Sequence, residues 1–157
     1  MLEIERFDLD GIASALSDQN LDDEYRHLID PETGKIGLWT REGGIDGKKS
    51  VDLDDLDVLV IRPLPSYVWQ QDMADFIDLV SDNRAAQRLA RAIRGRGGFR
   101  RFKDELNEEY PHLLQPWYGF RDTRAARRAV EWLRDESLID DAAAKRFFAE
   151  HPDPSVP

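Results

Sequence analysis

The period of the hydrophobic residues changes near residue 65. Before it, Tyr25, His27 and Ile29 recur at every second position of residues 24–29, which is typical of a strand, and residues 35–40 are expected to return as the second strand. The segment Asp30–Gly34 lies between them and has a proline and a glycine at the positions that a tight turn requires. Residues 58–63 form a short apolar run that ends at a proline, which indicates a buried strand. These segments predict a hairpin within a small, mostly antiparallel sheet.

Helical spacing governs the rest of the chain. Between Leu9 and Leu16, apolar residues recur on one helix face, and Asp8 or Asp10 is a suitable cap. After residue 65, apolar stripes of period 3.6 predict helices that begin near residues 66, 84, 99, 123 and 141. Residues 113–120, rich in aromatic side chains, are expected to be a linker. The predicted fold class is α+β, a small sheet in the N-terminal part followed by a helical layer of four to five helices.

Length and composition favour one domain with a real core. The chain has 157 residues, of which 41% are hydrophobic, and no cysteine, which excludes a disulfide scaffold and a cysteine nucleophile. We expect a single domain over residues 1–150, with a sheet-containing part (1–63), a helical part (66–150) and a flexible tail (151–157). The longest apolar run, Val58–Ile61, is far shorter than the ~20 residues of a membrane span. Because the start of the chain is acidic, unlike a signal peptide, we expect a cytoplasmic protein that does not enter a membrane.

The charges are distributed unevenly along the chain. The formal net charge is −10, yet residues 84–134 hold 13 basic and 6 acidic side chains. Between Arg84 and Lys103 there are eight basic residues and no acidic one. This block could bind an anion at short range, or it could dock on the acidic N-terminal half of the same chain. The second interpretation is favoured, because the overall acidity of the chain repels polyanions.

Residues 94–103 carry the most distinctive chemistry of the sequence. Glycines lead directly into a predicted helix, whose first N–H groups and positive dipole end attract anions. Arginine and lysine side chains around this turn could add charge-assisted hydrogen bonds to a phosphate or carboxylate. The segment is not a Walker loop, because no Lys-Ser/Thr pair follows at the required offset. The candidate anion-binding residues are Arg96, Gly97, Gly98, Arg100, Arg101 and Lys103.

A purely structural interpretation of the same segment is favoured over the anion site. In it, the glycines turn the corner between two helices, Phe99 and Phe102 are buried together with Leu106, and Arg100 and Arg101 pair with the acids four residues ahead. Arg100 decides between the two interpretations. If it is buried against an N-terminal carboxylate it is a structural clamp, and the clamp is favoured over the site.

Three further groups of residues are candidate sites. An aromatic patch of Trp117, Tyr118 and Phe120 could stack on a base or a sugar, although a core anchor is favoured. The acidic stretch Asp52–Asp57 lacks the EF-hand pattern and is interpreted as a solvated loop. The three histidines are far apart, and Gly-x-Ser-x-Gly is absent. We therefore expect no metal and no cofactor, and no catalytic residues can be named.

The helical half resembles a known bacterial family. The segment from Gly95 to Asp104, together with Trp117-Tyr-Gly-Phe120, the Glu131-Trp-Leu133 run and the turn after Asp30, is similar to the pattern of the bacterial uncharacterised protein family 0158. The resemblance covers about residues 8–135. It implies a compact bacterial domain and supplies no activity, substrate or site residue.

The sequence therefore predicts a non-catalytic binding or regulatory domain that acts through its helical half. Its partner would be a protein or a small anionic ligand, and formation of a homo-oligomer stays open. The alternative is a phosphate-handling enzyme or a nucleic-acid-associated protein that uses residues 94–103, although the net charge disfavours nucleic acid.

Overall fold

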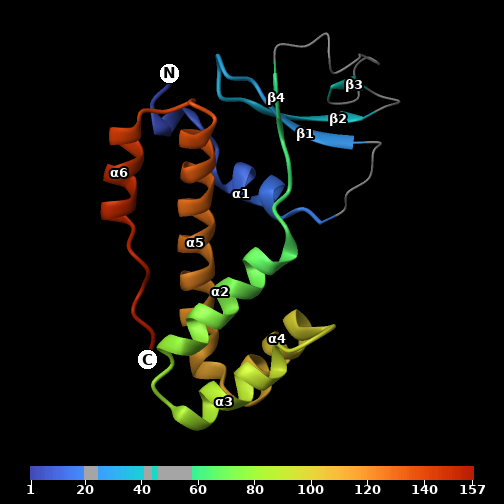
Figure 1. The fold of residues 1–157 in the computed structure, drawn as a ribbon, viewed down its shortest axis with the longest axis vertical. Helices are drawn as coiled ribbons and strands as arrows, with labels where there is room; N and C mark the ends of the chain where they lie inside the picture. Colours follow the sequence, from blue (N-terminus) through green and yellow to red (C-terminus); the bar gives the residue numbers. More distant parts are fainter. Residues whose placement is uncertain (20–24, 41–43, 46–57) are drawn as a thin grey trace. The chain divides into compact units, whose positions relative to one another are not determined.

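The computed structural model describes residues 1–19, 25–40, 44–45 and 58–157, which form two compact units (Figure 1). Unit 1 comprises Met1–Leu64 and Ala125–Glu150, and unit 2 comprises Pro65–Arg124 and His151–Pro157. The chain thus crosses between the units three times. The first crossing coincides with the change of hydrophobic period near residue 65. The prediction of one domain over residues 1–150 stays a prediction.

Unit 1 contains the sheet, which has four antiparallel strands among the described residues, in the order β3-β2-β1-β4. In its centre, Leu28 lies opposite Gly37 on one side and opposite Val60 on the other. The predicted small antiparallel sheet is confirmed. Its strands are β1 (Tyr25–Ile29), β2 (Ile36–Thr40), β3 (Gly44–Ile45) and β4 (Leu59–Ile61).

The predicted turn connects β1 to β2. The Asp30 N–H donates to the carbonyl of Lys35 at 2.9 Å, and the Gly34 N–H donates to the carbonyl of Asp30 at 2.8 Å. Gly34 has a φ of +78°, a conformation that residues with a Cβ rarely adopt. The glycine therefore closes the hairpin as the sequence predicts.

The helices of unit 1 complete its core. In α1 (Leu9–Ser17) the Oδ1 of Asp8 accepts the N–H of Gly11 at 3.0 Å, so Asp8 is the cap. α6 (Asp141–Glu150) lies beside the C-terminal part of α5 (Leu114–Asp135) (Figure 1). Aliphatic side chains dominate this core, chiefly Ile12, Leu16, Ile29, Ile61, Val130, Leu133 and Ile139.

Unit 2 is helical. It contains α2 (Ser66–Leu79), α3 (Asn83–Ala92), α4 (Gly98–Glu108) and the start of α5, after a short 3₁₀ turn, η3 (Pro111–Leu113). Five α-helices of the described chain thus follow the sheet, which confirms the α+β class and the expected helix number. Among the described residues, none of the helices has the length and apolar character that crossing a membrane requires.

The predicted linker over residues 113–120 is wrong. α5 begins at Leu114, and it continues without a break past Asp122 and Thr123, the predicted caps. Pro116 is compatible with this helix because it is the third helical residue, whose N–H would have no acceptor within α5. The proline and the large aromatic side chains therefore mark the first turns of a long helix.

Aromatic rings form the centre of unit 2. The ring centroids of Phe102 and Trp117 lie 4.9 Å apart, and those of Phe76 and Trp117 lie 5.3 Å apart, both in edge-to-face geometry. Phe102 and Leu106 are fully buried, as predicted, but Phe99 is 49% exposed. Phe99 lies in the first turn of α4, and it carries the ammonium of Lys103 over its ring at 5.8 Å instead of joining the core.

Candidate anion-binding surface

The basic block of the sequence forms α3, the turn after it and the first turn of α4. Asp82 caps α3, with its Oδ1 accepting the N–H groups of Arg84 at 2.9 Å and Ala85 at 3.3 Å. Ala85 and Leu89 are buried in the core of unit 2, whereas Arg84 and Arg91 on the same helix are exposed. One face of α3 thus packs into the core of unit 2, and the opposite face carries arginine side chains.

Two glycines shape the turn between α3 and α4. Gly97 has a φ of +74°, which favours glycine over residues with a side chain. At Gly98, a Cβ would lie 2.4 Å from the carbonyl oxygen of Ile93, a separation that no real Cβ tolerates. α4 therefore starts in direct contact with the backbone at the end of α3, and the turn is tightly folded.

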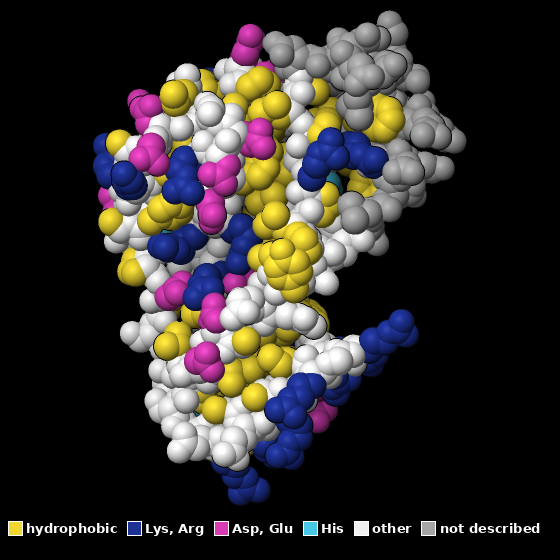
Figure 2. All heavy atoms as spheres, in the orientation of Figure 1, with side chains coloured by type: hydrophobic (Ala, Val, Ile, Leu, Met, Phe, Trp, Pro, Cys, Tyr) yellow, Lys and Arg dark blue, Asp and Glu magenta, His cyan; other side chains and the backbone are white. Residues whose placement is uncertain are grey.

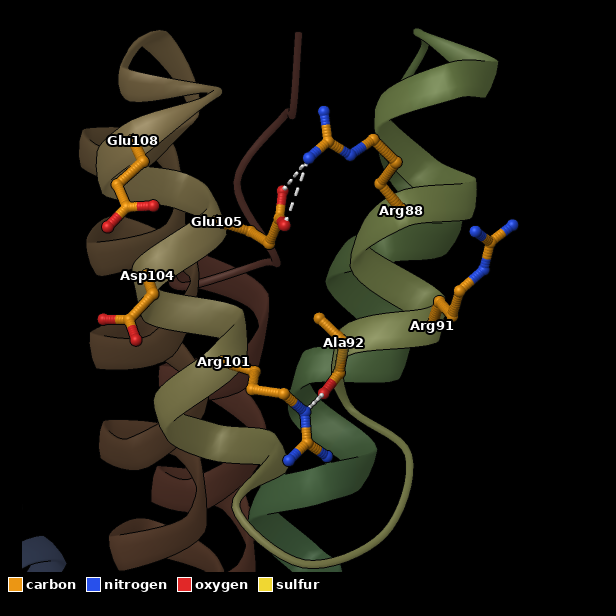
Figure 3. A pocket seen from close by; sticks show the side chains of 7 residues that line it. All are labelled: Arg88, Arg91, Ala92, Arg101, Asp104, Glu105 and Glu108. Carbon is orange, nitrogen blue, oxygen red and sulfur yellow. Dashed lines mark hydrogen bonds and ion pairs between the residues drawn. The ribbon is translucent and has the colours of Figure 1, made fainter.

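Arg101 ties this turn together. Its Nε donates to the carbonyl of Ala92 at 2.9 Å (Figure 3). Its two terminal nitrogens donate to the carbonyls of Arg94 and Arg96. These are carbonyl groups at and after the end of α3, where a helix leaves acceptors unpaired and favours a positive charge. Among the predicted anion-binding residues, Arg101 is thus engaged by the fold. No ion pair between Arg101 and Glu105 occurs in the described structure.

A charged groove lies between α3 and α4 (Figure 3). Arg88 pairs across it with Glu105 at 3.2 Å and with Glu109 at 3.6 Å. Desolvation lowers the pKa of Arg88 and the charge of Glu105 raises it, with a net rise, so the guanidinium stays charged. The groove has a volume of about 410 Å³ and is lined by Arg88, Arg91, Ala92, Arg101, Asp104, Glu105 and Glu108.

The remaining arginines of the block are exposed. There are five of them, and none has an ion-pair partner in the described part of the chain. Figure 2 shows Lys and Arg side chains gathered over α3 and the turn into α4. Arg100 is one of the five, so the prediction that it is a buried clamp is wrong, as is its expected pair with Asp104. We call this set, which consists of Arg84, Arg91, Arg94, Arg96 and Arg100, the arginine surface.

The candidate anion-binding residues thus separate into two groups. Arg96, Gly97 and Arg100 are exposed around the turn, and Lys103 is half-buried over Phe99. Gly98 is buried by its contact with Ile93, and the Arg101 guanidinium is held by backbone carbonyls. Binding of an anion at the exposed group stays a prediction.

The aromatic candidates lie elsewhere in unit 2. Trp117 is 1% exposed and Phe120 is fully buried, so neither ring is accessible to a ligand in this structure. Tyr118 is half-buried, and the guanidinium of Arg121 lies 4.8 Å from its ring centroid. The acidic stretch Asp52–Asp57 lies outside the described residues. Among those that are described, no group of three or more His, Cys, Asp or Glu side chains could hold a metal ion.

Sequence reasoning missed a cluster of charges around Arg124 in unit 2. Its Nη1 lies 2.8 Å from Asp75 and 3.4 Å from Asp72, while its Nε lies 2.8 Å from Asp153. Hydrogen bonding to Asp153, and then to Asp75, raises the pKa of Arg124 well above its ordinary value. Asp72 is 3% exposed, and it lies between Trp69 and Phe76 on the stripe that predicts the helix. A carboxylate inside an apolar stripe is the signal that could have found this cluster.

A second polar cluster, also missed, lies in unit 1. The Oδ2 of Asp18, just after α1, lies 2.8 Å from the Nε2 of His27 and accepts the hydroxyl of Tyr25 at 3.1 Å. Alternation on β1 puts Tyr25 and His27 on one face of the sheet, with their rings edge to face. The sequence signal was this alternation, but the carboxylate partner comes from a separate element.

Comparison with known proteins places the chain in a family. The model of an uncharacterised protein family, UPF0158, matches residues 7–148. A protein of Pseudomonas aeruginosa named UPF0158 protein PA5073 is 33% identical over 156 residues, which cover 96% of this chain and 95% of that protein. No solved structure matches the chain. The chain belongs to the uncharacterised protein family UPF0158, as the resemblance in its helical half predicts.

Proposed function

We propose that this protein is a non-catalytic binding module whose arginine surface recognises an acidic segment of a protein partner. One observation carries the proposal: five exposed guanidinium groups on α3, the turn after it and the first turn of α4 have no ion-pair partner among the described residues. A guanidinium binds a carboxylate through two parallel hydrogen bonds, and its weaker hydration makes it cheaper to bury at an interface than an ammonium. Such a set of cations fits a ligand rich in carboxylates.

The neighbouring groove supports binding over catalysis. Its lining consists of arginines, carboxylates and one alanine, and it contains neither a serine or cysteine nucleophile nor a histidine base. Arg88 and Glu105 neutralise each other there. The backbone beneath the arginine surface is also fixed, because Arg101 and the contact at Gly98 hold the turn. A fixed backbone reduces the ordering that binding requires.

The second candidate function is recognition of phosphates, by a nucleic-acid-associated protein or a phosphate-handling enzyme. Its support is the position of Arg94, Arg96 and Arg100 around the start of α4, where helix N–H groups attract anions. Against it stands the net charge of −10, which repels a long, densely charged nucleic acid more strongly at long range than it repels a short acidic segment. Phosphates and carboxylates are thus competing ligands for the same cations.

Fluorescence anisotropy with labelled ligands tests the proposal. A labelled oligo-glutamate peptide is titrated with the full chain over a salt series, beside duplex DNA and single-stranded RNA oligonucleotides. We expect the peptide to bind more tightly than either nucleic acid. If the nucleic acids bind more tightly, with a log–log salt slope of about −0.9 per phosphate on the duplex, the second candidate replaces the first.

Matched variants locate the binding. The triple variant Arg91→Gln, Arg94→Gln and Arg100→Gln should weaken peptide binding by about tenfold or more, since each charge-assisted hydrogen bond is worth about 1.5–3 kcal/mol. The control makes the same charge change on exposed residues of unit 1, namely Arg6→Gln, Lys35→Gln and Arg62→Gln. Equal losses in both triples would reduce the effect to net charge and contradict the arginine surface as the site.

A further inference from the structure

Residues 151–157 behave in the structure like a bound peptide. They follow α6 of unit 1, yet they pack with unit 2 and have no regular secondary structure. Three of the seven residues, Pro152, Pro154 and Pro157, are prolines, which restrict the backbone and lower the entropy lost on docking. The flexibility that the sequence predicts for residues 151–157 stays a prediction. The contacts of these residues are those of a docked segment.

The central contact is a two-point ion pair. The Nε of Arg124 donates to Oδ1 of Asp153 at 2.8 Å, and its Nη2 donates to Oδ2 at 2.8 Å. This is the fork-to-fork geometry in which arginine recognises a carboxylate most selectively. At 24% side-chain exposure, Arg124 is partly shielded from water, which screens the pair less than one on the open surface.

Unit 2 prepares Arg124 for this contact. Asp72 and Asp75, both on α2, hold the Nη1 end of the guanidinium, and the ring of Phe120 lies 4.8 Å from its central carbon. The edge formed by Nε and Nη2 is the part that faces Asp153. Because one edge of the guanidinium is fixed by α2, the other is already oriented for a carboxylate.

Two more contacts extend the site along the segment. Val156 packs against the apolar core of unit 2, three residues after the aspartate. The N–H of Ser81, two residues after α2, donates to the main-chain oxygen of Pro157 at 3.2 Å. Unit 2 therefore contacts the carboxylate of Asp153, the apolar side chain of Val156 and the main-chain oxygen of Pro157 in one extended stretch. Contacts of these three kinds are typical of peptide recognition.

We infer that the surface around Arg124 is a recognition site for extended Asp-Pro peptide segments, and that residues 151–157 occupy it as a built-in competitor. A segment with few buried residues and no helix or strand hydrogen bonds belongs to the part of a protein that opens most easily. Tethering gives it a high effective concentration, so that an outside peptide meets an occupied site. Loss of the Asp153 carboxylate would free the site without altering it.

Isothermal titration calorimetry on the full chain tests this inference. The probe is an acetylated and amidated peptide with the sequence of residues 151–157, added to the unaltered chain and to the Asp153→Ala chain. We expect the Asp153→Ala chain to bind the peptide about tenfold more tightly, because its own segment competes less well. The same peptide with asparagine in place of the aspartate should bind the Asp153→Ala chain at least about fivefold more weakly.

Two further measurements keep the outcome decisive. The Arg124 Nε–H resonance in the NMR spectrum should shift when Asp153→Ala is introduced and return towards its original position on addition of the aspartate peptide. A matched chain with Asp141→Ala, which removes an exposed carboxylate of unit 1, should bind the peptide no better than the unaltered chain. Equal peptide binding by all three chains, or no binding by the Asp153→Ala chain, would overturn the inference. The arginine surface takes no part in this test, so its result is separate from that of the proposed function.

Discussion

Units 1 and 2 hold their charges in different ways. Unit 1 has 12 basic and 22 acidic residues and therefore carries the whole net charge of −10, whereas unit 2 has ten of each. In unit 2, arginines pair with carboxylates around Arg88 and Arg124 and with carbonyls around Arg101. The overall acidity of the chain is thus a property of unit 1. It says little about the local potential of the arginine surface.

The cores of the two units differ as well. Unit 1 is built on aliphatic side chains between helices and a sheet, and unit 2 on four buried aromatic rings between helices. Long arginine side chains suit the second kind of unit, because their stems cover apolar surface and their heads reach distant carbonyl or carboxylate groups. The arginines of residues 84–103 that make no such ion pair or hydrogen bond form the arginine surface.

The largest expected effect comes from breaking the aromatic core. Phe102→Ala removes a fully buried ring that contacts Trp117 and Phe76, and it should lower the free energy of unfolding by about 3–5 kcal/mol. Phe99→Ala, three residues earlier, removes a half-exposed ring and should cost less than about 1 kcal/mol. Urea denaturation followed by circular dichroism measures both. Equal losses would contradict the assignment of Phe102 to the core and Phe99 to the surface.

The same experiment sharpens the comparison of the units. Leu133→Ala in the core of unit 1 should cost about 2–5 kcal/mol. Because α5 runs unbroken from unit 2 into unit 1, we expect Leu133→Ala and Phe102→Ala to shift one common transition, as the single-domain prediction requires. Two separate transitions, each moved by only one of the substitutions, would show that the units unfold independently.

A smaller loss of stability is expected when the hydrogen bonds of Arg101 are removed. Arg101→Ala leaves three carbonyl groups at and after the end of α3 without their donor and should cost about 1–3 kcal/mol. Arg101→Lys should not restore this stability, because an ammonium lacks the fork that reaches all three. Arg100→Ala, its exposed neighbour, should stay within about 0.5 kcal/mol of the unaltered chain. Urea midpoints give the three values, and a loss at Arg100 as large as at Arg101 would reverse their assigned roles.

Local patterns in the sequence predicted much of this fold. The turn that ends at Gly34 was predictable because its residues fix the backbone themselves, and the stripe with Phe102 was predictable because burial follows helical spacing. The start of α5 was not, since Pro116 usually signals a loop and only its position in the first turn makes it compatible with a helix.

The candidate site was less predictable than the fold. Spacing along α4 treats Arg100 and Arg101 alike, and only the position of the end of α3 decides which guanidinium reaches its carbonyls. Arg124 and Asp153 are separated by 28 residues, so their ion pair depends on tertiary packing that a local pattern does not contain. Hydrogen bonds and ion pairs between residues that are distant in sequence therefore become known only from the structure.

The smallest effect concerns the polar cluster of unit 1, in which the carboxylate of Asp18, just after α1, contacts Tyr25 and His27 of β1. Tyr25→Phe removes the hydroxyl that donates to Asp18 and should lower the free energy of unfolding by about 1 kcal/mol, the net value of one hydrogen bond to a partly buried acceptor. The loss stays small because Asp18 keeps its contact with His27 at 2.8 Å. Tyr67→Phe is the matched control: it deletes the same atom from a side chain that is 68% exposed and should change nothing measurable. Urea denaturation of both variants gives the difference, and a Tyr25 value no larger than that of Tyr67 would show that the hydroxyl contributes no net stability to unit 1.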